Sequence, residues 1–134
     1  MSPEGIDWRR HVFVVGDYGA GVLTGAATAA AVRAVVGPSM DMVLAMLIGM
    51  GLGMAVHLTI GVTLSPALGA FHVMIPGSLI GTYGGMLFAM RDTMQAHPGS
   101  FDRAVIIGAV FGATVVAAVR ALDRALRAAD SGKV

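Results

Sequence analysis

The chain of 134 residues contains no cysteine, so it can form neither a disulfide framework nor a thiolate metal site. Charged residues are also scarce, at 13% of the chain, against about 25% in an ordinary soluble domain. The formal net charge is only +1, and no basic stripe with interleaved aromatic residues occurs. We therefore expect no nucleic-acid partner.

The sequence motifs of several enzyme classes are missing as well. It has no P-loop, no dinucleotide-binding glycine fingerprint, no H-E-x-x-H and no G-x-S-x-G. The glycine-rich runs lie inside apolar segments rather than after strands, so they are not typical of phosphate-binding loops. No pair of carboxylates lies within the apolar segments. We therefore expect that the protein is not an enzyme.

Apolar residues, by contrast, are abundant, at 56% of the chain with a mean hydropathy of +0.78. Residues 42–90 contain no Asp, Glu, Lys or Arg. One helical membrane crossing takes about 20 apolar residues, so this run has room for two. A soluble domain this small could not bury so much apolar surface. The sequence predicts an all-α polytopic protein of the lipid bilayer, with one transmembrane domain over residues 1–134.

About four transmembrane helices in a compact bundle are predicted, at residues 12–36, 40–63, 66–94 and 102–129. Ser39 or Asp41 is expected to cap the second helix. The third helix contains Pro76 and Gly77. It either begins at Pro66 and kinks at Pro76, or begins at Ser78 after a re-entrant loop.

Each predicted helix carries one G-x-x-x-G pair, and such pairs let helix backbones approach closely in lipid. The four pairs are Gly21/Gly25, Gly49/Gly53, Gly81/Gly85 and Gly108/Gly112. They predict a compact bundle, and they could also drive self-association into a homo-oligomer or docking to a partner in a larger membrane complex.

Lysine and arginine indicate how the helices are oriented, because they collect on the cytoplasmic side of a membrane. With four crossings both termini lie on one side. Six basic residues lie on that side and three on the other: Arg9, Arg10, Arg120, Arg124, Arg127 and Lys133 against Arg33, Arg91 and Arg103. We expect a multi-pass protein of the cell inner (plasma) membrane with both termini in the cytoplasm.

Methionine recurs every four residues in two of the predicted helices, which keeps it on one helical face. The second helix ends its ladder in a histidine, and a third-helix histidine shares the face when Pro76 only kinks that helix. The residues are Met42, Met46, Met50, Met54 and His57, then His72, Met86, Met90 and Met94. Thioether sulfur selects Cu(I), and imidazole also suits copper. A methionine stripe is equally compatible with ordinary packing in a core.

Asp17 is the second candidate, because a carboxylate at membrane depth is costly and by default marks a functional site. It could bind a cation, relay a proton, or pair with His11 or an arginine. It could also lie at headgroup level, where water solvates it. His11 lies at the expected inner end of the first helix, toward which His57 and His72 also lie.

The M-x-x-x-M step over Met42–Met54, together with the glycine pairs, is similar to the trimeric copper transporters of the Ctr type. The resemblance implies copper transport and covers no more of the chain than these residues. Those transporters have three crossings and a methionine-rich outer tail, whereas four crossings and no such tail are predicted here. No residue role is therefore carried over.

The sequence thus leads to three hypotheses. The first is a membrane protein that binds or translocates a soft metal ion, Cu(I) first, along the methionine ladders toward His57, His72, His11 and Asp17. The second is a structural or assembly subunit of a larger membrane complex. The third is a small proton or cation channel that uses Asp17 and the histidines.

Overall fold

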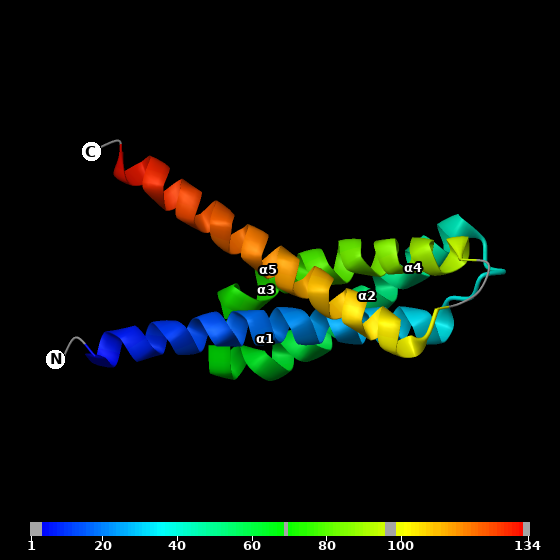
Figure 1. Ribbon diagram of the computed structural model, residues 1–134, viewed down its shortest axis with the longest axis horizontal. Coiled ribbons are helices and arrows are strands. Elements are labelled where there is room, and N and C mark those ends of the chain that lie inside the picture. The colour runs from blue at the N-terminus through cyan, green and yellow to red at the C-terminus, as the bar shows by residue number, and fades with distance from the viewer. Residues whose placement is uncertain (1–3, 69, 96–98, 133–134) are drawn as a thin grey trace.

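The computed structural model describes residues 4–68, 70–95 and 99–132, and every regular element among them is helical. The elements are α1 (Glu4–Val35), α2 (Met42–Leu68), α3 (Ala70–Leu79), the π-helical turn η1 (Ile80–Gly84), α4 (Gly85–Met94) and α5 (Phe101–Ser131). Because α3, η1 and α4 follow one another without a break, they form the third of four helical segments. These segments pack into one bundle, with both ends of the chain at the same end of it (Figure 1). The predicted all-α bundle is confirmed.

The third segment corrects both sequence-based alternatives for its start. It begins at Ala70, because Pro66 lies inside the last turn and a half of α2 and does not start a new helix. Pro76 lies within α3, where it removes one helical hydrogen bond, and the wide turn η1 follows. The backbone stays helical through both features, so the re-entrant loop is wrong. The helical segment simply tolerates the proline.

Other helix ends also differ from the prediction. α1 begins at Glu4, well before the expected start near Val12, and α5 runs to Ser131. The polar first turns of α1 do not look apolar enough for a membrane segment, yet nothing in them breaks a helix. Asp41 is the N-cap of α2, because its Oδ1 accepts hydrogen bonds from the N–H groups of Val43 and Leu44, both at 3.0 Å.

Two antiparallel helix pairs form the bundle, and each pair meets along glycine. In the first glycine seam, Gly21 and Gly25 of α1 face Gly112 and Gly108 of α5. A Cβ atom added to Gly25 would lie 3.0 Å from the carbonyl carbon of Gly108 and closer still to its oxygen. No side chain fits there, so the prediction that these glycines allow close backbone approach is confirmed.

The second glycine seam joins α2 to the third helical segment in the same way. Gly49 faces Gly85, and Gly53 faces Gly81. A Cβ atom on Gly85 would lie 2.7 Å from the carbonyl carbon of Gly49. All four sequence pairs are therefore used inside one chain, pair against pair.

An apolar cluster joins the two helix pairs near the end of the bundle opposite the termini. Its buried members are Ala29, Val32, Val36, Ala45, Phe88 and Ala89, and Met40, Ile48 and Phe111 pack against them. The rings of Phe88 and Phe111 meet edge to face with centroids 5.5 Å apart. This cluster fixes which side of α2 and α4 faces α1 and α5.

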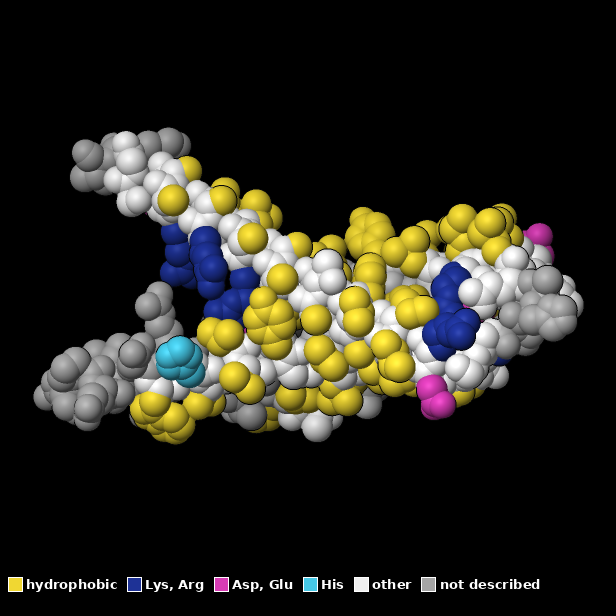
Figure 2. All heavy atoms as spheres, viewed as in Figure 1, with side chains coloured by type: hydrophobic (Ala, Val, Ile, Leu, Met, Phe, Trp, Pro, Cys, Tyr) yellow, Lys and Arg dark blue, Asp and Glu magenta, His cyan; other side chains and the backbone are white. Residues whose placement is uncertain are grey.

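In the part of the chain that the structure describes, three helices are long and apolar enough to cross a membrane: His11–Val35, Met42–Pro66 and Phe101–Ser131. Most of each apolar window is exposed outside the bundle. Figure 2 shows hydrophobic side chains over most of the middle of the molecule. An apolar surface this extensive is stable in lipid and not in water, so the chain is a membrane protein.

Candidate metal site

The methionine ladders take their position from the second glycine seam. Met50 directly follows Gly49 on α2, and Met86 directly follows Gly85 on α4. Each step along a helix turns by about 100°. Because the two helices face each other and run in opposite directions, this turn carries both methionines to the same side of the seam.

Packing on the other side of the seam confirms this arrangement. Ile48 directly precedes Gly49, Phe88 directly precedes Ala89, and both pack into the cluster that contains Val32 of α1. Residues before a seam position therefore face α1, and residues after it face away from α1. We call the outer surface the methionine face, and its members are Met42, Met46, Met50 and Met54 of α2 and Met86, Met90 and Met94 of α4.

The two ladders overlap along the helix axes. Since Gly49 faces Gly85 in an antiparallel pair, Met46 lies level with the turn between Met86 and Met90. The backbones of these three methionines lie within about one helical turn, or about 5 Å, along the axis. Met54 lies level with η1, where the third segment carries no methionine. The overlap is therefore confined to the half of the seam nearer the start of α2.

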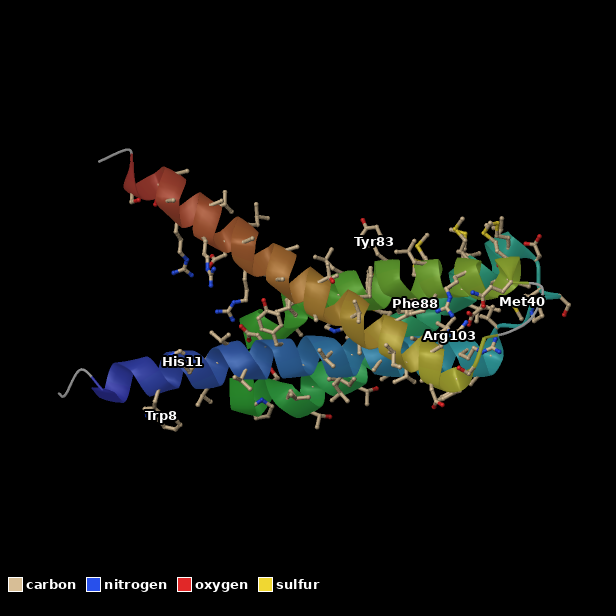
Figure 3. The ribbon with its side chains drawn as sticks, viewed as in Figure 1. Trp8, His11, Met40, Tyr83, Phe88 and Arg103 are labelled. Atoms are coloured by element: carbon tan, nitrogen blue, oxygen red, sulfur yellow. The ribbon has the colours of Figure 1, made fainter. Side chains whose placement is uncertain are left out.

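Burial differs along the methionine face. Met46, Met50, Met54, Met86 and Met90 are all partly buried. Met42 and Met94, at the end of the bundle opposite the termini, are exposed, with Met94 at 68%. Figure 3 shows sulfur atoms at this end, near the labelled Met40, which itself packs against the apolar cluster. The face therefore runs from an accessible end to a more enclosed middle.

His57 does not lie on this face but continues the seam itself. It is buried between α2 and α3, with its ring over Gly77, and a Cβ atom on Gly61 would lie 3.6 Å from Cε1 of the ring. A side chain at position 77 would collide with Nδ1 and Cε1 of that ring. Among the described residues, nothing hydrogen-bonds Nδ1. The imidazole thus fills a gap that two glycines leave open.

Replacing Gly77 by alanine is expected to destabilise the bundle by about 2 kcal/mol, because the new methyl group and the His57 ring need the same space. The same substitution in a His57→Ala background is expected to cost much less. Thermal unfolding in detergent, followed by circular dichroism, measures both. Equal costs in the two backgrounds would show that the ring does not fill this space.

Asp17 lies in the first helix pair, away from the methionine face. Its Oδ2 accepts a hydrogen bond from Nη1 of Arg120 at 2.9 Å, and the two charges form an ion pair. Of the roles open to Asp17 from the sequence, pairing with an arginine is the one confirmed. Asp17 shares the helical face of Gly21 and Gly25, so it belongs to the first glycine seam.

The remaining predicted residues do not join the methionines either. His11 is exposed on α1 (Figure 3). Thr28 contacts the seam at Gly53, which places His11 about 20 Å along the bundle from the level of His57. His72 lies in α3, and its side chain is outside the described residues. The structure therefore brings the methionines of α2 and α4 together and leaves His11 and Asp17 apart from them.

At the opposite end of the bundle lies a buried carboxylate that reasoning from the sequence did not single out. Asp92 is 2% exposed, and its Oδ2 lies 3.9 Å from Nη1 of Arg33. The pair links the end of α4 to the end of α1. The available signal was Arg33, an arginine just inside a helix end that needs a partner in a membrane protein.

The kinds of side chain that the fold brings together determine which metal ions it could bind. Among the side chains that the structure describes, no three from His, Asp or Glu come together in a group that could hold a metal ion. Methionine sulfur is the metal-binding donor that the fold gathers from two helices onto one surface. Thioethers prefer soft ions such as Cu(I).

Comparisons with known proteins found no relative that could assign a function. No family model, no curated protein and no solved structure matches the chain. The candidate site therefore rests on the glycine seam, the apolar cluster and the two methionine ladders.

Proposed function

We propose that the protein binds a soft metal ion, Cu(I) first, on the methionine face and passes it along that face through the membrane. One observation carries the proposal: the second glycine seam and the cluster around Val32 turn the methionines of both helices to the same side. Methionines that only filled the core would point toward α1 and α5. The two ladders instead share the side of the seam that faces away from α1.

The chemistry of thioethers supports movement as well as binding. A thioether carries no charge and binds Cu(I) without proton release, whereas a cysteine thiol must lose its proton to bind. A row of weak sites lets an ion enter and leave, which conduction requires. The ion would enter at the exposed end, beside Met42 and Met94. It would then reach the overlap of the two ladders at Met46, Met86 and Met90. Met54 extends the row from there in the direction of His57.

The two other sequence hypotheses gain less from the fold. An assembly subunit would use the glycine pairs to dock onto its partner. Here the glycine pairs pack against one another within the same chain. Asp17, the centre of the channel hypothesis, is engaged by Arg120. The distribution of arginine places the exposed end, with Met42 and Met94, outside the cell in this proposal.

Substituting Met46, Met86 and Met90 together by leucine tests the proposal. Leucine nearly conserves volume and packing but removes the sulfur. If each thioether contributes about tenfold, or about 1.4 kcal/mol, the triple variant should lose about three orders of magnitude in Cu(I) affinity. Competition with a chromogenic Cu(I) chelator in detergent gives the affinity, and element analysis of the purified protein gives the stoichiometry.

Met74→Leu is the matched control, because Met74 is exposed on α3 and is not part of the methionine face. It should leave copper binding unchanged. Wild-type stoichiometry and affinity in the triple variant would remove the proposal, and so would an equal loss in Met74→Leu.

A further inference from the structure

The space between the diverging ends of α1 and α5 forms a second candidate site, separate from the methionine face. The two helices stay in contact along the first glycine seam and are joined last by Asp17 and Arg120. Beyond Arg120, α5 continues to Ser131, a length of about 16 Å. Figure 1 shows the two helices opening there like a V, with both termini at its tips. We call this opening the terminal cleft.

Arginine lines the α5 side of the terminal cleft. Arg120, Arg124 and Arg127 fall within an arc of about 60° on the helix. Figure 2 shows Lys or Arg side chains along α5 in the opening and a histidine on the facing helix, where Figure 3 labels His11.

Arg124 is the arginine of the cleft that has no ion pair among the described residues. Arg120 pairs with Asp17, and Arg127 pairs with Asp123 at 2.9 Å in an exposed i, i+4 ion pair. Arg124 makes no ion pair with any residue that the structure describes. Two of the three guanidinium groups thus pair with carboxylates, and that of Arg124 is uncommitted.

The outer sides of both helices carry apolar residues at the same level. On α5, Leu122 and Leu126 are 60% and 62% exposed on the face opposite the arginines. On α1, Trp8 is 61% exposed and points away from the cleft (Figure 3). Tryptophan collects where membrane meets water. Apolar outer faces and a basic inner face therefore place the cleft at the level of the lipid headgroups.

We propose that the terminal cleft binds the phosphate headgroup of an anionic lipid. A planar guanidinium matches two phosphate oxygens at once, and Arg124 has no competing carboxylate among the described residues. Asp17 holds Arg120 at the closed end of the cleft, which leaves the open end to Arg124 and Arg127.

Trp8, the only tryptophan, points away from the cleft, so the reporter is moved to its inner side in an otherwise wild-type protein: Trp8→Phe is combined with His11→Trp on the helix that faces the arginines. The protein is placed in vesicles that contain brominated phosphatidylglycerol or brominated phosphatidylcholine at equal mole fraction, because bromine quenches tryptophan nearby. Phosphatidylglycerol should quench more. The double variant Arg124→Gln, Arg127→Gln should lower this preference at least about fivefold.

Arg103→Gln removes one arginine at the opposite end of the bundle and should keep the preference. Equal quenching by the two lipids in the wild type would overturn the proposal. An undiminished preference in the double variant would overturn it too. If excess inorganic phosphate abolishes the preference, the cleft takes free phosphate, and the assignment to lipid is wrong. Circular dichroism checks that the double variant keeps its helices, as expected for exposed positions.

Discussion

Gly53→Ala is expected to destabilise the bundle by about 2–3 kcal/mol. The added methyl group would collide with the backbone carbonyl of Gly81 across the second glycine seam, and its Cβ atom would lie 2.8 Å from that carbonyl carbon. A backbone group cannot rotate away as a side chain can, so the helices must separate, and overpacking of this kind costs about 1–3 kcal/mol. Separation would also weaken the other close contacts along the seam.

Gly51 provides the matched control two residues away on the same helix. Nothing lies within 4 Å of a Cβ atom added there. Gly51→Ala should therefore stabilise the protein by up to about 1 kcal/mol, because alanine favours a helix interior over glycine. Unfolding in a titration of denaturing into mild detergent gives both free energies. The prediction is a difference of sign, and destabilisation of similar size by both substitutions would contradict the seam.

Arg120→Gln is expected to cost about 2 kcal/mol, because it removes the guanidinium group that pairs with the carboxylate of Asp17. The side chains of Asp17 and Arg120 are 15% and 27% exposed. Breaking a fully buried ion pair costs about 3–5 kcal/mol, and partial exposure lowers this figure. The loss should be accompanied by a wider opening between α1 and α5, since this ion pair joins the two helices at the closed end of the terminal cleft.

A double variant separates the charge from the shape of the side chains. Asp17→Asn combined with Arg120→Gln should be more stable than Arg120→Gln alone, because the negative charge that Arg120 balances is then removed as well. Arg127→Gln breaks an exposed ion pair with Asp123 and should cost less than about 0.5 kcal/mol. If Arg120→Gln and Arg127→Gln cost the same, Asp17 is solvated by water and not held by Arg120.

Much of the fold follows from periodicities that are visible along the chain. The charge-free run over residues 42–90 requires lipid, and the glycine pairs mark where helices touch. Helix ends were harder to predict, because polar first turns such as those of α1 are compatible with a helix outside the membrane. Pro76 was ambiguous for a similar reason. A proline removes one hydrogen bond, and only the packing around it decides whether the helix continues.

The candidate site was likewise predictable only where it depends on helical periodicity. The four-residue spacing of Met46 and Met50 places them on one helical face, whatever the fold. The same spacing predicted that His57 shares their face. In the structure the His57 ring instead fills the gap over Gly77 in the seam. The partner of Asp17 could not be found from the sequence, since Arg120 is 103 positions away and is one of several arginines.

The sequence alone determined that this is a helical membrane protein with glycine contacts and two methionine ladders, because hydropathy and helical periodicity are local properties of the chain. Only the tertiary structure decided that Gly49 and Gly53 face Gly85 and Gly81, that both ladders turn away from α1, and that Arg120 holds Asp17. Pairing is a choice among helices of similar composition. It is settled by which backbones can approach most closely, and that depends on all the helices at once.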